Sequence, residues 1–115
     1  MDSNKIALLV ALMLVVWMFL QRRGGIAPAE ARRLVKEEGA RLLDVRSAGE
    51  FASGHLEGAK NVPVHELADR LGELGPKDGS VVVYCASGAR SASATKLLRS
   101  AGFAKVANLG AMSRW

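Results

Sequence analysis

The sequence predicts a layered α/β domain, with a mainly parallel central sheet flanked by helices, joined to one N-terminal transmembrane helix. Residues 80–84 form a continuous, mostly β-branched run between turn signals, which is typical of a strand covered on both faces of a parallel sheet. Short runs of this kind alternate with stretches of helical periodicity from residue 28 onward. Ahead of them, residues 6–20 are apolar without interruption.

The apolar run at residues 6–20 contains no charge, glycine or proline. In a helix it spans roughly 22 Å, short of a hydrocarbon core of about 30 Å unless flanking side chains extend it or the bilayer thins. The main alternative is a cleaved signal peptide, but Arg22 and Arg23 follow the run instead of preceding it. We therefore predict an anchor and linker over residues 1–25 and a second domain over residues 26–115.

Basic residues near the apolar run predict its orientation. Lys5 alone precedes the run, whereas several basic residues follow it, beginning with Arg22 and Arg23. The positive-inside rule therefore places the C-terminal domain in the cytoplasm, and a bacterial inner membrane is the expected membrane. Cys85 is the single cysteine, which excludes an internal disulfide and suits a reducing compartment.

Composition excludes some other classes of function. The formal charge is +5, but no basic block with interleaved aromatic residues occurs, so nucleic-acid binding is not expected. One cysteine and two histidines, far apart in sequence, lack the spacing of a zinc site. We therefore expect neither a metal nor a cofactor.

The first half of the domain begins with a helix. Pro28 suits a first helical turn, Glu30 favours the positive end of the helix dipole, and Gly39 is a plausible stop. The further elements predicted in this half are a buried strand over residues 41–45, a short helical stretch over residues 48–53 and a brief strand over residues 60–62, ended by Pro63.

The second half continues the alternation of helices and strands. Apolar residues recur at positions i, i+3, i+4 and i+7 over residues 64–71, which predicts an amphipathic helix. The strand at residues 80–84 follows a turn and ends at Cys85. A third helix is predicted around residues 94–101, stopped by Gly102, and a last strand over residues 105–108.

Cys85 lies at the C-terminal end of the predicted central strand, where open α/β sheets place their ligands. The following residues, Ala86-Ser87-Gly88-Ala89, have little side-chain bulk, so their backbone amides can form an anion cradle at the start of a helix. Such a setting stabilises a thiolate and lowers the pKa of the thiol. Arg90 adds a positive charge to the same rim. An inert, buried cysteine is the alternative.

Four segments, in this order, resemble the signatures of rhodanese domains. They are Leu43-Asp44-Val45-Arg46 with Glu50-Phe51, Gly54-His55-Leu56-Glu57-Gly58-Ala59 with Asn61-Val62-Pro63, Cys85 to Ser91, and Leu109-Gly110-Ala111-Met112 with Trp115. The resemblance implies a sulfurtransferase or persulfide carrier. Its Cys85 thiolate would accept a sulfur atom from thiosulfate or a persulfide donor and pass it to a thiol or to cyanide.

The resemblance also implies roles for other residues. The substrate-binding loop would consist of Ala86, Ser87, Gly88, Ala89 and Arg90. Asp44 and Arg46 would support that loop, and His55 would be a hydrogen-bonded core residue. Many active relatives carry a basic residue in the place of Ala86, so a persulfide is a more plausible donor than thiosulfate. Many relatives also continue past the position of Trp115, which implies that one side of the core is either thinner here or completed by a partner. A membrane protein is a further possible partner of the domain.

Two other functions are compatible with a rhodanese-like scaffold. A non-catalytic binding module is disfavoured because Cys85 is retained. A phosphatase or arsenate reductase is disfavoured because the phosphatase branch of this fold has a loop one residue longer than the stretch from Cys85 to Arg90.

Overall fold

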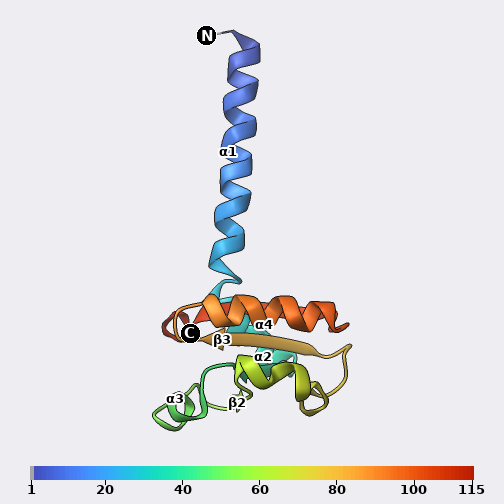
Figure 1. Ribbon diagram of the computed structural model, residues 1–115. Helices are drawn as coiled ribbons and strands as arrows, with labels where there is room; N and C mark the ends of the chain where they lie inside the picture. The colour runs from blue at the N-terminus through green and yellow to red at the C-terminus, as the bar shows by residue number, and fades with distance from the viewer. Residues whose placement is uncertain (1) are drawn as a thin grey trace.

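The computed structural model describes residues 2–115, without the side chains of residues 19–24. Short 3-10 helices are labelled η. In chain order, the elements of this described part are α1 (Ser3–Gly24), α2 (Pro28–Glu37), β1 (Arg41–Asp44), α3 (Ala48–Ala52), β2 (Lys60–Asn61), η1 (Val64–Asp69), η2 (Leu71–Leu74), β3 (Ser80–Cys85), α4 (Ala89–Ser100), β4 (Lys105–Ala111) and η3 (Met112–Arg114). Figure 1 shows α1 extending away from the domain that the other elements form.

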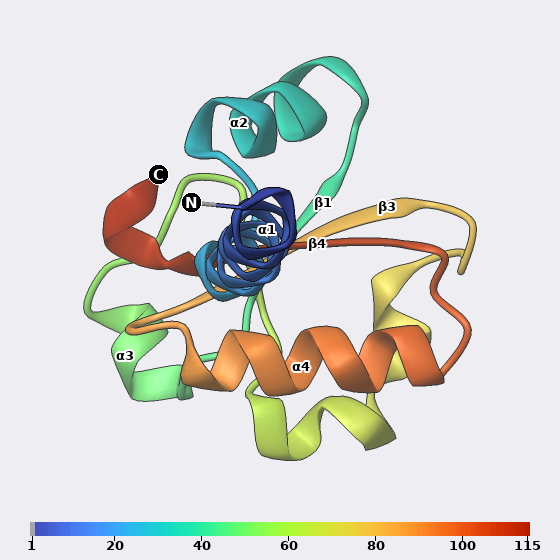
Figure 2. The ribbon, with the colours of Figure 1, turned by 90° about the horizontal axis from the view of Figure 1, so that it is seen from above.

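The strands of the described chain form one parallel sheet in the order β2-β1-β3-β4 (Figure 1). β3 is paired on both sides, with β1 and with β4, as its continuous apolar run predicted. α2 covers one face of the sheet, and α4 covers the other together with η1 (Figure 2). The predicted α/β architecture with a parallel sheet is therefore confirmed.

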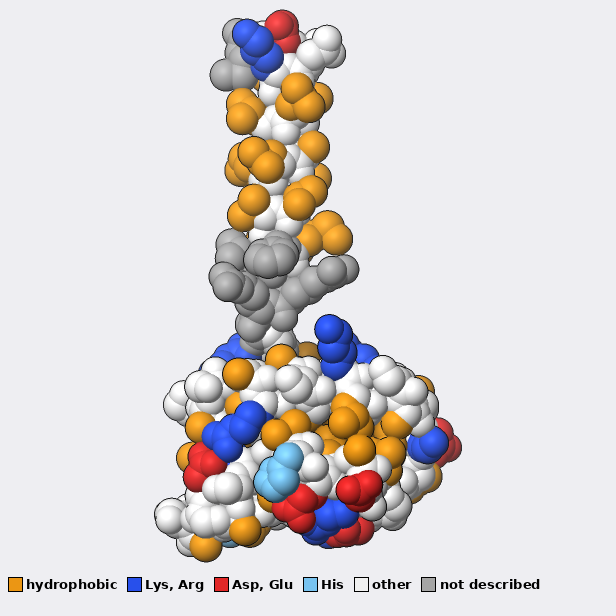
Figure 3. Space-filling model, in the orientation of Figure 1, with side chains coloured by type: hydrophobic (Ala, Val, Ile, Leu, Met, Phe, Trp, Pro, Cys, Tyr) orange, Lys and Arg blue, Asp and Glu red, His pale blue; other side chains and the backbone are white. Residues whose placement is uncertain are grey.

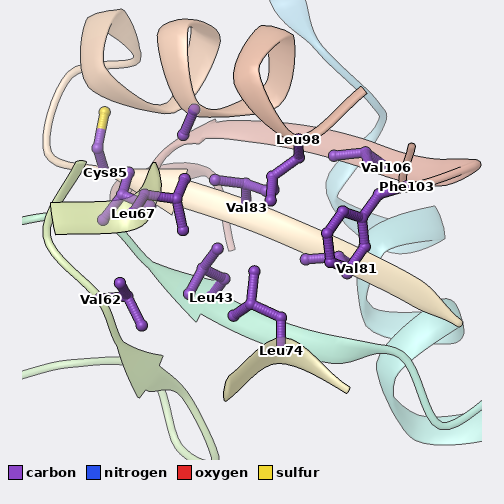
Figure 4. Close-up of a cluster of buried hydrophobic side chains, with 12 residues drawn as sticks. Leu43, Val62, Leu67, Leu74, Val81, Val83, Cys85, Leu98, Phe103 and Val106 are labelled. Carbon is purple, nitrogen blue, oxygen red and sulfur yellow. The ribbon is translucent and has the colours of Figure 1, made fainter. Parts of the chain in front are cut away.

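Alternate residues of the strands fill two hydrophobic cores, one on each face of the sheet. On the α4 side, Val81 and Val83 pack with Leu98 (Figure 4). On the α2 side, Val82 and Tyr84 are fully buried. Burying a side chain of this size contributes about 1.5–3 kcal/mol, so the two cores hold β3 firmly in place. This packing therefore fixes the position of Cys85, the last residue of β3.

The structure corrects the predicted α-helix over residues 64–71, which is η1 followed by η2. The amide of Glu66 donates to the carbonyl of Pro63, and the amide of Arg70 donates to that of Leu67, at 2.9 and 3.0 Å. These bonds span three residues, as in a 3-10 helix. Arg70 then leaves the helical region, at φ −123° and ψ 21°. The apolar spacing still indicates the buried face correctly, because Leu67 is buried in the α4-side core.

α1 confirms a helix over the apolar run, and its large apolar side chains up to residue 18 are exposed (Figure 3). Among the described residues, no helix is both long and apolar enough to cross a membrane, so the predicted transmembrane helix is not supported. The apolar run at residues 6–20 ends within residues 19–24, whose side chains are not described. Arg22 and Arg23, on which the predicted orientation depends, also lie in that stretch.

The chain enters the domain beside β4, an edge strand of the sheet. The amide of Ile26 donates to the carbonyl of Asn108 at 2.8 Å. Gly25 has φ +66°, and a Cβ atom there would lie 2.0 Å from the same carbonyl oxygen. Only glycine fits this close approach of two backbones, so Gly25 sets where α1 meets the domain.

Candidate active site

Cys85 is the last residue of β3, and none of its surface is exposed. Its side chain belongs to the core on the α4 side, and Figure 4 shows the sulfur at the end of the strand, pointing toward the helix layer. The carboxyl end of β3 therefore presents Cys85 to the turn that begins α4, as the strand pattern predicted.

The sulfur atom of Cys85 lies in a small ring of hydrogen bonds. The backbone amide of Gly88 donates to Sγ at 2.9 Å. The thiol in turn donates to Oγ of Ser91 at 3.5 Å, and the Ser91 hydroxyl donates to the carbonyl of Gly88 at 3.0 Å. These three residues close a short circuit of hydrogen bonds around the sulfur.

This environment favours the thiolate form of Cys85. Burial has the largest single influence and raises the pKa of the thiol. The Ser91 hydroxyl and three backbone amides, those of Ser91, Gly88 and Ser87, together outweigh burial and hold the pKa below its ordinary value. Because the thiolate is the nucleophilic form of a cysteine, this site is suited to nucleophilic chemistry.

The ring depends on an unusual backbone conformation at Gly88. Gly88 caps the N-terminus of α4 with φ +108°, a region that residues with a Cβ atom rarely adopt. This conformation turns its amide toward Sγ and lets α4 begin at Ala89. The sequence reasoning expected small residues here, and the structure shows that the glycine is needed for its backbone.

The predicted substrate loop lies at the surface above the buried sulfur. The side chains of Ala86, Ser87 and Ala89 are exposed, while Gly88 and Arg90 are half-buried. Ser87 contributes its backbone amide to the sulfur, and the residue as a whole is exposed. Because these side chains are small, they do not block access to the sulfur from this side.

Ser91 is a site residue that the sequence reasoning missed. It is fully buried and is the residue whose hydroxyl reaches Sγ. A signal was present, because Ser91, Ala94, Thr95 and Leu98 follow the spacing i, i+3, i+4 and i+7. These residues form the buried face of α4, so a polar residue in this series had to find a partner beneath the helix.

The charge of Arg90 is paired with an acidic partner, which the sequence reasoning did not foresee. Its guanidinium forms two hydrogen bonds with the carboxylate of Glu50, at 2.7 and 3.0 Å. Glu50 belongs to α3, where the amide and hydroxyl of Ser47 also donate to it in a capping box. The Arg90 guanidinium, followed by the Ser47 bonds, lowers the pKa of Glu50 to about 2. Both partners are therefore charged over the physiological pH range.

Asp44 and Arg46 form a buried ion pair at the end of β1. Arg46 donates from Nη2 and Nε to the Asp44 carboxylate, at 2.7 and 3.1 Å, and donates to the carbonyl of Gly54 at 2.8 Å. Asn61 donates to the carbonyls of both partners, at 3.0 and 2.9 Å. These bonds tie the segment from Gly54 to Asn61 to the sheet. Asp44 also acts on the active-site loop through its charge, since it raises the pKa of Arg90 after the larger effect of Glu50.

His55 differs from its expected place in the core. Its ring is exposed and stacks on Phe51, with ring centres 3.6 Å apart and planes 4° from parallel. Nδ1 lies 2.8 Å from the carbonyl of Phe51, so the expected hydrogen bond is present. His65 is also exposed. Within the described part of the chain, no group of histidine, cysteine and acidic residues is arranged to hold a metal ion.

Three comparisons with known proteins agree with this geometry. Residues 27–115 match the family described as Rhodanese-like domain. A sulfurtransferase of Allochromatium vinosum is 40% identical over 86 residues, which cover 74% of this chain and 79% of that protein. The thiosulfate sulfurtransferase GlpE of Pseudomonas aeruginosa is 36% identical over 91 residues, covering 78% and 81%. The solved human single-domain sulfurtransferase TSTD1 superposes with a TM-score of 0.69 at 33% identity, covering 80% of this chain and 94% of that one.

Proposed function

Because this chain belongs to the family of rhodanese-like domains, we propose that it is a sulfurtransferase that carries a sulfur atom as a persulfide of Cys85. One observation carries the proposal: Sγ of Cys85 accepts a hydrogen bond from Gly88 and lies against the Ser91 hydroxyl, in a site that lowers the pKa of the thiol. A buried core cysteine without a function would not need such a ring of hydrogen bonds.

In the first half-reaction, the Cys85 thiolate attacks the outer sulfur of the donor. A bond forms between Sγ and that sulfur, and the bond that joined it to the donor breaks. From thiosulfate, the electron pair of this bond leaves on sulfite; from a persulfide, it leaves on the donor thiolate. The total charge is unchanged, and Cys85 becomes a persulfide.

In the second half-reaction, an acceptor thiolate or cyanide attacks the terminal sulfur of the persulfide. The sulfur–sulfur bond breaks, and its electron pair returns to Sγ of Cys85. The amides of Ser87, Gly88 and Ser91 stabilise the negative sulfur in both halves, in the manner of an oxyanion hole. Since one site serves both substrates in turn, we expect ping-pong kinetics.

The proposal is tested by following sulfur on Cys85. Mass spectrometry of the protein after treatment with thiosulfate or cysteine persulfide should show one added sulfur atom. Cys85→Ser should neither gain this sulfur nor transfer sulfur to cyanide, while its circular dichroism stays that of the wild type. Transfer that persists in Cys85→Ser would refute the proposal, and a wild-type protein that takes up no sulfur would favour a binding module instead.

We further propose that α1 attaches the domain to a bacterial inner membrane, with Cys85 on the cytoplasmic side. The large apolar side chains between Ile6 and Met18 are 48–70% exposed, and leaving them in water costs about 0.8 kcal/mol per methylene. The basic residues Arg22 and Arg23 follow the apolar run in the sequence, which favours a cytoplasmic domain.

A further inference from the structure

We propose that Glu50 determines donor specificity, by neutralising Arg90 at the mouth of the site and so disfavouring dianionic donors relative to singly charged persulfides. This inference rests on the proposed sulfur transfer. It assigns a role to a residue of α3, a helix that supplies none of the atoms around the sulfur of Cys85.

The ion pair lies at the surface and joins α3 to the first turn of α4, the helix that follows the Cys85 loop. Glu50 and Arg90 are 40 positions apart, and their side chains are 38% and 36% exposed. Two parallel hydrogen bonds join them, and the Ser47 hydroxyl also donates to the carboxylate. A bidentate pair of this kind holds the guanidinium in one orientation.

Arg90 is the second residue of α4 and follows the end of β3 at Cys85 by five positions, so its charge lies on the same loop as the sulfur. After the larger effect of Glu50, the Cys85 thiolate also contributes to raising the pKa of Arg90. A free guanidinium here would attract a dianion such as thiosulfate about twice as strongly as a monoanion, because the Coulomb energy scales with charge. The Glu50 carboxylate cancels most of that attraction.

The rest of the loop does not replace the neutralised charge. Ala86, directly after Cys85, is exposed and has no charge. The amides that face the sulfur are dipoles whose field acts over a short distance. They therefore stabilise the transferred sulfur more than the charged SO3 part of an incoming thiosulfate ion. A donor with one negative charge therefore meets less repulsion from the thiolate than thiosulfate does.

The test compares thiosulfate with cysteine persulfide in the full chain. Glu50→Gln should lower the KM for thiosulfate by about fivefold, as expected for one partly screened charge, and the KM for cysteine persulfide by only about twofold, because a singly charged donor gains about half the Coulomb energy. The decrease in the thiosulfate KM should be smaller in 1 M salt, where the Debye length is about 3 Å. Glu37→Gln removes the same charge from α2, on the opposite face of the sheet, and should change neither KM.

Two further variants separate the charge effect from a structural one. The double variant Glu50→Gln with Arg90→Gln should lose the gain, because the effect acts through Arg90. Ala86→Arg adds an unpaired cation at an exposed position, so it should also lower the KM for thiosulfate even if Glu50→Gln fails to fold.

An unchanged thiosulfate KM in folded Glu50→Gln, a gain that survives in the double variant, or an unchanged KM in Ala86→Arg would overturn the inference. The wild type distinguishes these results from failure of the proposed function. If cysteine persulfide still loads one sulfur on Cys85, only the role of Glu50 is refuted.

Discussion

At the scale of single residues, Ser91 and Gly88 decide how readily Cys85 ionises. The Ser91 hydroxyl sits between Sγ and the carbonyl of Gly88, so it can turn to donate to the sulfur once the thiol loses its proton. The hydroxyl is fully buried and has no competing water exposure. A buried donor aimed at a developing charge is worth more than the same donor in water.

Removing the Ser91 hydroxyl should shift the pH dependence of the reaction. The pKa of Cys85 is lowered in the folded protein, so the thiolate persists at high pH and disappears as the pH falls through that pKa. In Ser91→Ala the pKa rises, and the acid limb of kcat/KM for the donor should move to higher pH. Ser93→Ala, at an exposed position of α4, is the control. An acid limb at the wild-type pH in Ser91→Ala would mean that the backbone amides suffice.

The buried pair of Asp44 and Arg46 should matter for stability. Asp44→Asn leaves the Arg46 guanidinium without its charged partner in a site where its side chain is only 6% exposed. Removing one partner of a buried pair costs about 3–5 kcal/mol, which urea unfolding would detect as a lower midpoint. Glu30→Gln breaks the exposed pair with Arg33 and should leave the midpoint close to that of the wild type. Equal midpoints for the two variants would show that the buried pair contributes little.

At the scale of elements, the junction of β3 with α4 combines a strand end, a cradle and a helix start. β3 brings Cys85 to the carboxyl end of the sheet, and Gly88 adopts a positive φ immediately before α4 begins. The buried face of α4 then places Ser91 beneath its first turn. The helix that completes the core on this side therefore also supplies the hydroxyl that hydrogen-bonds the Cys85 thiol.

Gly88→Ala should damage both stability and activity. A residue with a Cβ atom at φ +108° is strained by about 1–3 kcal/mol, and relief of that strain would move the amide away from Sγ. We expect a lower unfolding midpoint and a lower kcat/KM for the donor. Gly49→Ala, within α3 and next to open space, should instead stabilise the protein by up to about 1 kcal/mol. Full activity in Gly88→Ala would contradict the role assigned to this amide.

At the scale of the whole molecule, charge and apolar surface are unevenly distributed. Residues 79–115 contain no acidic residue, whereas their basic residues are Arg90, Lys96, Arg99, Lys105 and Arg114. These residues belong to α4, β4 and η3, and α1 joins the domain beside β4. Although Arg90 is paired with Glu50, the net positive charge of this part of the sequence supports the membrane attachment proposed for α1, because anionic lipids attract basic segments.

Membrane attachment should be visible in cell fractionation and thiol labelling. The wild type should pellet with membranes, and Cys85 should resist an impermeant thiol reagent until the cells are opened. Leu12→Arg with Val16→Arg should release the protein, since each charge in an apolar span costs about 2.5–3.5 kcal/mol. Glu37→Arg, on α2, adds positive charge outside α1 and should leave the protein in the pellet. Labelling before the cells are opened would reverse the proposed orientation.

Most of the secondary structure follows from local patterns in the chain. The apolar run ending at Cys85 marks the central strand, and Pro28 and Gly39 mark the limits of α2 within two residues. The loop from Cys85 to Arg90 is contiguous, so its small residues and its place before a helix are visible in the sequence. These features depend on neighbours within a few positions, and burial of one face of each element is enough to impose them.

The pairings across the site were decided by the tertiary structure alone. The bond between Glu50 and Arg90 joins α3 to α4 because the sheet order β2-β1-β3-β4 brings the segments after β1 and β3 together. His55 stacks outside the core, and the turn at Arg70 makes 3-10 helices where the periodicity predicts one α-helix. Hydrophobic periodicity indicates which face of an element is buried. It does not indicate which of many side chains will form an ion pair with a given charged residue. That choice is made only when packing places one of them within hydrogen-bonding distance.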